Sequence, residues 1–201
     1  PEGIVVYRVP EPDRLADGEV PATAYRFVFP DGEHDCETVM ADPRTGRLYF
    51  VTKSPRGGAL YAAPEKPSAI GLNVLSYLRE IPLVTSDGLI TPKGHMILRG
   101  YGKIMVWERP LGRVLTTIQI PKQPQGEGIA LSADATELLI SSEQAHTPVW
   151  RMRLPEPLAG HPSPAPRIAP LADAEQSGPG LWWGVAGGLT LLVLAVAFVF
   201  A

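Results

Sequence analysis

The sequence predicts an all-β fold, because one hairpin pattern occurs three times along the chain. Each copy begins with an acidic or polar residue, continues as a short apolar run, passes through a turn and ends in a run of β-forming residues. The copies are ETVMADPRTGRLYFVTK (37–53), SDGLITPKGHMILR (86–99) and EGIALSADATELLISSE (127–143). Their starts lie 49 and 41 residues apart. Strand-like sequence with a period of about 40 to 50 residues is typical of β-propeller blades.

Composition agrees with many short strands and excludes several functions. The 201 residues include 22 prolines and 20 glycines, which disfavours a helical bundle. The net charge is -3 and there is no run of Lys and Arg, so nucleic acid is not an expected partner. Cys36 is the only cysteine, which excludes an internal disulfide and a cysteine-based zinc cluster.

The remaining strands of each blade are expected around the hairpins. GIVVYRV, ALYAAP, KIMVWER and PVWRMRL have the character of third strands, while YRFVF, LREIP and TTIQIP precede the three hairpins. Four third strands indicate four blades, of which residues 1–154 hold about three and a half with four strands each. Blades bury both faces against neighbours, so HMIL and ELLI are expected to be apolar on both sides.

The C-terminal part differs from the rest. Residues 155–180 contain seven prolines and predict an extended linker. Leu181–Ala201 holds 21 residues without a charge, which at about 1.5 Å per residue spans a bilayer core of about 30 Å. We expect a transmembrane helix, with Trp182 and Trp183 at the interface. A buried core helix is the alternative.

Three glycines recur at four-residue spacing in and beside this segment, at Gly180, Gly184 and Gly188. Such spacing permits close approach and self-association of membrane helices. Glycine is also common in membrane spans generally, so the spacing has a second explanation that needs no partner helix.

The residues PQGEGIALSADATELLISSE, DCETVMADPRTGRLYFVTK and VTSDGLITPKGHMILRGYGKIMVWERP resemble bacterial β-propellers of WD40-like and phytase-like or esterase-like type. The similarity is strongest to membrane-anchored actinobacterial-type examples. In that group a D-x-E or G-E-G element opens the strand nearest the axis, here Asp35 with Glu37 and Gln125 to Gly128. Turns of S-P-D-G or D-P-x-T-G type follow, here Asp42 to Gly46 and the altered forms Thr91 to Gly94 and Ser132 to Ala135. A closed propeller typically has six or seven blades, so we expect further blades upstream of Pro1 or from a second chain.

The resemblance and the proline-rich linker imply a single-pass protein of the cell membrane with an extracytoplasmic propeller. The charge pattern does not fix this orientation, because no Lys or Arg follows Leu181–Ala201 and Arg167 is the nearest before it. A tail-anchored protein facing the cytoplasm is the alternative.

Three acidic residues start equivalent inner strands and are expected to face one axial channel: Glu37, Asp87 and Glu127. Asp35 could add a further oxygen. Calcium takes six to eight oxygen ligands, so this set is a candidate calcium site. The alternative is that these carboxylates accept hydrogen bonds from backbone N–H groups of the next blade and hold the inner strands in register.

Other polar residues give weaker indications. Lys53, Arg99 and Glu143 close second strands and are expected to be solvated on one rim. The four histidines lack metal-ligand spacing and are expected at the surface. The carboxylates of Asp35 and Glu37 should raise the pKa of the Cys36 thiol, which argues against a nucleophile. The glycines of QGEG (125–128) are read as turn residues, since no Lys or helix follows them.

Two functions follow from these features. The main prediction is a binding or scaffold module that presents a rim or channel to a protein or small-molecule ligand. The alternative is a phytase-like or esterase-like hydrolase that uses a metal held by the axial carboxylates.

Overall fold

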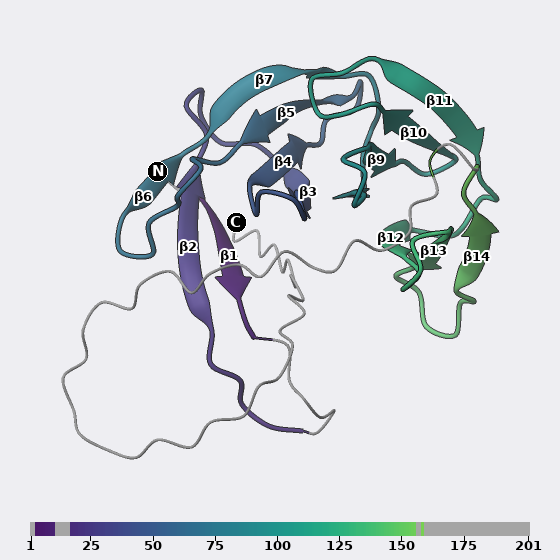
Figure 1. The fold of residues 1–201 in the computed structure, drawn as a ribbon, viewed down its shortest axis with the longest axis horizontal. Coiled ribbons are helices and arrows are strands. Elements are labelled where there is room, and N and C mark those ends of the chain that lie inside the picture. The colour runs from purple at the N-terminus through teal and green to yellow at the C-terminus, as the bar shows by residue number, and fades with distance from the viewer. Residues whose placement is uncertain (1–2, 11–16, 156–157, 159–201) are drawn as a thin grey trace.

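A computed structural model describes residues 3–10, 17–155 and 158, and this part of the chain is all-β. Its strands form four small sheets that follow one another in an arc (Figure 1). Apart from Pro155 and Leu158, the predicted linker lies outside the described residues, as do the predicted transmembrane helix and the glycines from Gly180 to Gly188. Within the described ranges, no helix is long and apolar enough to cross a membrane.

Each sheet is named here by its strands, in the order in which they pair. The first sheet contains β1 (Ile4–Arg8), β2 (Thr23–Val28) and β6 (Leu72–Val74). The second contains β3 (Cys36–Ala41), β4 (Leu48–Thr52), β5 (Gly58–Ala62) and β7 (Ser76–Ile81). The third contains β8 (Asp87–Ile90), β9 (Met96–Arg99), β10 (Lys103–Trp107) and β11 (Val114–Gln119). The fourth contains β12 (Gly126–Leu131), β13 (Glu137–Ser142) and β14 (Trp150–Arg153).

The three predicted hairpins are confirmed as β3–β4, β8–β9 and β12–β13, all antiparallel. The expected third strands are β1, β5, β10 and β14. The second and third sheets are four-stranded, as blades of a propeller should be. The all-β prediction and a partial propeller are therefore supported by the strand order itself.

Strand β6 was not predicted, and it pairs parallel to β2. Its outer residues Leu72 and Val74 are exposed, so it carries no apolar period that a sequence pattern could detect. The buried side chain of Asn73 holds it in place: Nδ2 donates to the carbonyl oxygens of Arg26 and Ser68, at 2.9 Å each. The Asn73 amide and the parallel pairing with β2 together dock this segment onto the first sheet.

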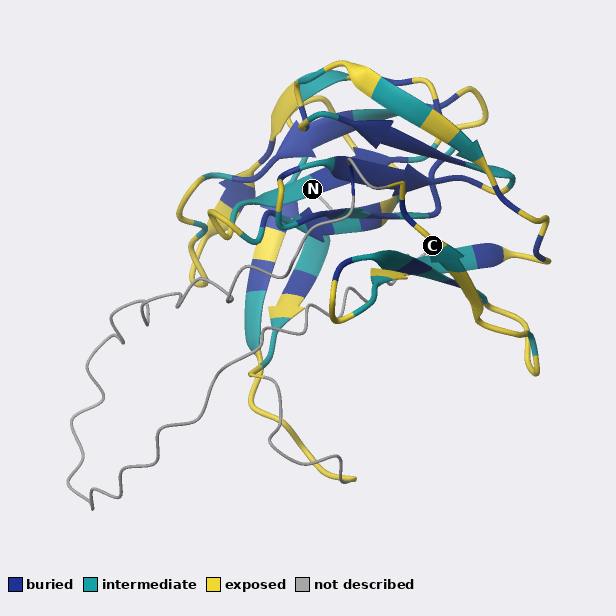
Figure 2. Ribbon diagram, turned by 45° about the vertical axis from the view of Figure 1, so that its right-hand side comes forward, coloured by how far each residue is buried: buried dark blue, intermediate teal, exposed yellow. Residues whose placement is uncertain are grey.

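Apolar side chains fill the three interfaces between neighbouring sheets. Buried residues are dark blue along the strands in Figure 2. Strand β9 lies in the middle of this core: Met96 and Leu98 pack toward the second sheet and Ile97 toward the fourth. All three are fully buried, which confirms the prediction that HMIL is apolar on both sides.

The corresponding prediction for ELLI is wrong in part. Leu138 and Ile140 are buried, while Leu139 between them is only half-buried. The fourth sheet packs against the third through one face, and no other described sheet covers its second face. Its strands therefore alternate as in a sheet with one buried side.

The inner strands β3, β8 and β12 lie side by side, with β8 in contact with both of the others. Two faces result, which we name by their position along these strands. The strand-start face carries residues Asp35–Glu37, Asp87 and Gly126–Glu127. The turn face carries the turns that follow the same strands, at residues 42–46, 91–94 and 132–135.

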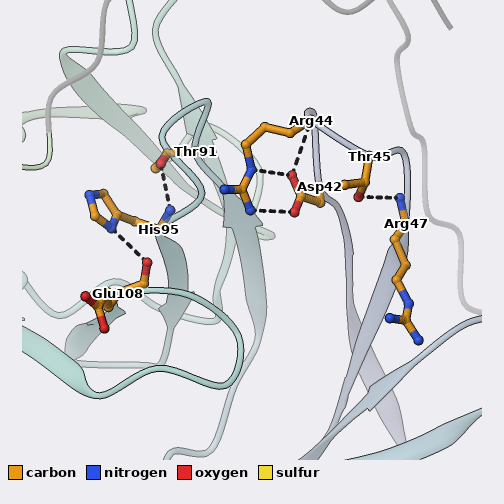
Figure 3. A network of polar contacts seen from close by, with 7 residues as sticks. All are labelled: Asp42, Arg44, Thr45, Arg47, Thr91, His95 and Glu108. Carbon is orange, nitrogen blue, oxygen red and sulfur yellow. Dashed lines mark hydrogen bonds and ion pairs between the residues drawn. The ribbon is translucent and has the colours of Figure 1, made fainter. Parts of the chain in front are cut away.

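The turn face is held by contacts within and next to its turns, of which Figure 3 shows those at residues 42–46 and 91–94. The Asp42 carboxylate accepts hydrogen bonds from Arg44 Nε at 3.0 Å, Nη2 at 2.7 Å and the Arg44 backbone N–H at 3.0 Å. The Arg44 guanidinium lies over Gly94 of the next blade, where a Cβ would stand 2.3 Å from it. Gly94 also has a φ of 89°, so this turn requires glycine for two reasons.

Candidate functional site

The two strongest predicted site residues occupy equivalent irregular positions. The pairing register of β3 shifts between Cys36 and Thr38, and that of β12 shifts between Gly126 and Ile129. Glu37 and Glu127 lie inside these bulges. Bulges re-aim side chains and are frequent beside active sites. In the first and third hairpin copies, a β-bulge therefore places a glutamate on the strand-start face.

Glu37 binds a lysine from its own blade. Its Oε2 accepts from Lys53 Nζ at 2.5 Å, and Nζ also donates to the Tyr101 hydroxyl oxygen at 2.8 Å. Nζ lies 5.3 Å from the centroid of the Tyr101 ring as well. Burial alone would lower the pKa of Lys53, but the bonds to Glu37 and Tyr101 raise it well above its ordinary value. Lys53 is a firmly charged cation with one N–H left to give.

Arg99 is fully buried beneath this face, contrary to the prediction that it is solvated on a rim. Its Nη1 donates to the carbonyl oxygens of Gly128 and Ser141 at 2.6 Å each, and Nη2 donates to Gln123 Oε1 at 2.5 Å. The physical reason is that Arg99 stands one residue earlier in its hairpin than Lys53 and Glu143 stand in theirs. The backbone N–H groups of Lys53 and Glu143 donate to the carbonyls of residues 35 and 125, whereas Arg99 uses its backbone carbonyl, which accepts from the Ser86 N–H. Its side chain therefore turns inward to the next blade.

The glycines of QGEG form the other half of this contact, so reading them as turn residues is incomplete. A Cβ on Gly126 would lie 2.2 Å from Arg99 Nη2, and one on Gly128 would lie 2.5 Å from Ser141 Oγ. A side chain at Gly126 would displace the Arg99 guanidinium, and one at Gly128 would displace the Ser141 hydroxyl. It is Gln125 that takes the left-handed turn conformation, with a φ of 43°. We call Arg99, Gln123, Gly126 and Gly128 the arginine cradle.

Glu127 is half-buried above this cradle, and no hydrogen bond or ion pair to its carboxylate occurs in the described part of the chain. Burial raises its pKa, and the nearby charges of Glu37 and Glu143 raise it further, while Lys53 and Arg99 act in the opposite direction. An unpaired carboxylate with a raised pKa between two cations is suited to proton transfer.

Asp87 has a structural role instead. Its Oδ1 accepts from the Gly88 N–H at 2.7 Å, and its Oδ2 accepts from the Ile129 N–H at 2.8 Å. The second bond crosses from β8 to β12, which is the strand-register alternative put forward above. Burial raises the pKa of Asp87, and the two backbone bonds and Arg99 partly offset that rise.

The carboxylates do not converge as a metal site would require. Asp35 is exposed, Glu37 holds Lys53, and both oxygens of Asp87 are engaged with backbone N–H groups. Across the residues the structure describes, no group of three or more His, Cys, Asp and Glu side chains could hold a metal ion. The donor set therefore does not fit calcium, and no step below is assigned to a metal.

Two further predictions concern Cys36 and the histidines. Burial raises the pKa of the Cys36 thiol to about 12, with smaller contributions from Asp35 and Glu37. The predicted direction is correct, although burial rather than charge is the main cause. His34 is exposed, as predicted, and it has partners at the surface: its Nε2 lies 3.1 Å from Asp31 Oδ1, and its ring packs edge-on against Phe29.

Sequence reasoning missed Tyr101 and Gln123. Both lie in loops between strands, and each bonds to a residue from another loop or strand, Lys53 at 48 positions and Arg99 at 24 positions along the chain. The only sequence signal was their place in the two loops that open onto the strand-start face, after β9 and before β12.

No known family profile matches the sequence, and no curated protein is similar enough to match. Among solved structures, a gluconolactonase from Xanthomonas campestris is similar at 18% identity and a TM-score of 0.47, covering 70% of this chain and 47% of that one. A protein from Lactobacillus plantarum is similar at 11% identity and a TM-score of 0.39, covering 75% of this chain and 52% of that one. The chain thus spans about half the length of these structures.

The prediction of a binding or scaffold module is corrected: the similar solved structure with a named activity is a gluconolactonase, not a binding module. At 18% identity and a TM-score of 0.47, this similarity carries neither a role nor a substrate nor a mechanism to this chain. The hydrolase alternative therefore depends on the residues of the strand-start face alone.

Proposed function

We propose that the strand-start face hydrolyses a carboxylic ester or lactone, with Glu127 as the general base. The observation that carries this proposal is the state of Glu127: a half-buried carboxylate with a raised pKa, held between cationic residues and free of hydrogen bonds within the described residues. Burial and the neighbouring carboxylates raise its pKa, which makes it a stronger base than an ordinary glutamate.

Lys53 supplies the complementary group. Its ammonium has three N–H donors, of which one is given to Glu37 and one to Tyr101. The third is available for the oxygen of a substrate carbonyl. Because Glu37 and Tyr101 fix Nζ, this donor is pre-oriented toward charge that develops during reaction.

The proposed reaction follows directly. Glu127 takes a proton from a water molecule, whose oxygen forms a bond to the carbonyl carbon. The carbonyl oxygen becomes an oxyanion beside Lys53, and the tetrahedral intermediate collapses as the bond to the alcohol oxygen breaks. Glu127 returns its proton to that alcohol, so the site is regenerated.

The charges favour an acyl group over a phosphoryl group as substrate. A transferring phosphoryl group spreads charge over three oxygens and needs several cations. On this face Arg99 is fully buried, its Nη1 and Nη2 bond to two carbonyls and to Gln123, and its unpaired Nε is buried as well, so Lys53 is the cation of the two that a substrate can reach. One cation suits one oxyanion. The esterase-like reading is therefore preferred to the phytase-like one.

The test is hydrolysis of p-nitrophenyl acetate and of δ-valerolactone by the purified chain and by Glu127→Gln. Glutamine keeps the shape but cannot accept the proton, so we expect a loss of about 100-fold or more in kcat/KM. Asp134→Asn, on the turn face, is the matched control and should hydrolyse both substrates like the parent. Equal rates for the parent and Glu127→Gln would refute the proposal.

We also propose that Leu181–Ala201 anchors the chain in the cell membrane with residues 1–154 on the extracytoplasmic side. The support is the uncharged length of the segment and the proline-rich stretch before it. The full chain should partition into detergent, while a chain ending at residue 180 should stay in the aqueous phase. Equal partitioning of the two chains would contradict the anchor.

A further inference from the structure

One hydroxyl group on the strand-start face is bonded on one side only. The Tyr101 oxygen accepts a hydrogen bond from Lys53 Nζ at 2.8 Å. The proton of this hydroxyl has no acceptor in the described part of the chain. A phenolic hydroxyl can accept and donate at the same time, so Tyr101 keeps one donor for another partner.

This proton cannot be given to Lys53. Although burial acts against it, the bonds to Glu37 and Tyr101 raise the pKa of Lys53 well above its ordinary value, so the ammonium stays charged and has no lone pair to offer. The Tyr101 proton therefore points away from Nζ. Tyr101 is 40% exposed, so the residue is open to a molecule that binds on this face.

The loop that carries Tyr101 is closed by backbone hydrogen bonds. It joins β9 to β10, and across it the Gly100 N–H donates to the Lys103 carbonyl at 2.9 Å. The Gly102 carbonyl accepts from the Ile120 N–H at 3.1 Å, which ties the loop to the end of the outer strand β11. The backbone of Tyr101 is thus fixed before a substrate arrives, as preorganised stabilisation of charge requires.

Lys53 and Tyr101 are spaced so that one oxygen atom can bond to both. Their polar atoms lie 2.8 Å apart, and hydrogen bonds to oxygen from nitrogen or hydroxyl donors are about 2.7–3.0 Å long. An oxygen at that distance from both atoms completes a triangle. Burial raises the pKa of Glu127 and the charge of Lys53 acts against that rise, so the pair lies near the proposed base.

We propose that the Tyr101 hydroxyl is a second donor to the oxyanion, so that Lys53 and Tyr101 bind the same substrate oxygen. This inference rests on the proposed function, to which it adds a catalytic residue. A hydroxyl bonds more strongly to an anionic oxygen than to a neutral carbonyl. Its bond therefore strengthens as the oxyanion forms, which lowers the barrier rather than only tightening the substrate.

The first test is ester hydrolysis by Tyr101→Phe, which keeps the ring beside Lys53 and removes the hydroxyl. We expect kcat and kcat/KM for p-nitrophenyl acetate to fall together by about tenfold to 100-fold, with KM unchanged. Tyr7→Phe, the same change at a residue of β1 that is 45% exposed, is the matched control and should hydrolyse like the parent. A parental rate in Tyr101→Phe would overturn the inference and leave the role of Glu127 standing.

The second test is binding, which does not depend on hydrolysis. The probe is p-nitrophenyl methylphosphonate, a stable tetrahedral anion, titrated into the full chain by calorimetry. We expect Tyr101→Phe and Lys53→Met each to weaken it about tenfold, and the double variant about 100-fold. A tyrosine that only positions Lys53 would add nothing to Lys53→Met.

The inference is overturned by a parent that does not bind the phosphonate, by Tyr101→Phe that binds it like the parent, or by a double variant no weaker than Lys53→Met. The role of Glu127 fails by a different result. If Glu127→Gln hydrolyses esters like the parent while Tyr101→Phe weakens the phosphonate, the base is wrongly assigned and the second oxyanion donor stands.

Discussion

The strand-start face and the turn face are built from the same three hairpins, yet their polar side chains bond in opposite ways. On the turn face, Asp42 bonds to Arg44 and Ser132 bonds to Asp134, each pair two positions apart. On the strand-start face, Lys53 bonds to Tyr101 across 48 positions and Arg99 bonds to Ser141 across 42 positions. The polar side chains of the turn face form hydrogen bonds with residues nearby in the sequence, whereas those of the strand-start face bond to residues of other blades.

The turn face therefore holds the fold, whereas the strand-start face carries the candidate catalytic residues. A local turn can complete its hydrogen bonds within its own blade, as Asp42 does with Arg44 and Ser132 does with Asp134. The strand-start face brings charges from different blades together, and it leaves Glu127 without a partner among the described residues. Functional groups are expected where polar side chains lack hydrogen-bond partners. The predictions below test this contrast in order of decreasing effect.

The largest effect is expected for the buried arginine. Arg99→Met should destabilise the fold by about 3–5 kcal/mol, because it leaves the acceptors of Gly128, Ser141 and Gln123 buried and unpaired. Arg44→Met, on the turn face, should cost no more than about 1 kcal/mol, since its side chain is 48% exposed. Urea denaturation measures both. Similar losses for the two variants would erase the contrast between the faces.

A smaller effect is expected at the link between inner strands. Asp87→Asn keeps the shape of the side chain but turns an amide N–H₂ toward one of two backbone donors, Gly88 or Ile129. We expect a loss of about 1–3 kcal/mol. Amide hydrogen exchange at Ile129 should accelerate more than exchange in the first sheet. Unchanged protection of Ile129 would show that the bond between β8 and β12 does not hold the register.

The smallest expected effect is a difference between the two faces in how a carboxylate on each changes protein stability with pH. The folded pKa of Glu127 is raised above 4.5, chiefly by burial, so its contribution to stability is present below that pH and is lost as pH rises through the folded pKa. Hydrogen bonds from Ser132 and Thr136 lower the folded pKa of Asp134 from 3.8 to about 2, so its contribution is present above 3.8 and is lost as pH falls toward 2.

At pH 7, Glu127→Gln should therefore be more stable than the parent, and Asp134→Asn should be less stable. Both differences should shrink on acidification, the first below about pH 4.5 and the second only near pH 2. Thermal unfolding followed across this range gives the sign for each variant. Shifts of the same sign at pH 7 would contradict the assignment of opposite roles to the two carboxylates.

Much of the fold could be predicted because propeller hairpins are local. The turn at Asp42–Gly46 and the β-forming runs on either side of it specify β3 and β4 without reference to the rest of the chain. Strand β6 escaped prediction because three residues carry no period, and its docking depends on Asn73, which bonds to a strand 47 positions away.

The candidate site could be predicted only in outline, for the same physical reason. The repeat placed Glu37, Asp87 and Glu127 at equivalent strand starts, but their partners come from other loops and blades. Sequence spacing could not show that Lys53 neutralises Glu37 or that backbone N–H groups occupy Asp87. It also treated Arg99 as a solvated strand end, because a one-residue offset in pairing is invisible in the pattern.

The proposed role of Glu127, a base whose pKa its surroundings raise, is tested most directly by the pH dependence of kcat/KM for ester hydrolysis. We expect the rate to rise with pH through a single ionisation above 4.5, the ordinary pKa of glutamate. Glu37→Gln removes one of the charges that raise this pKa, so it should move the inflection to lower pH. Glu127→Gln should lose the inflection together with the activity. An inflection that persists in Glu127→Gln would refute the role of Glu127 as the base.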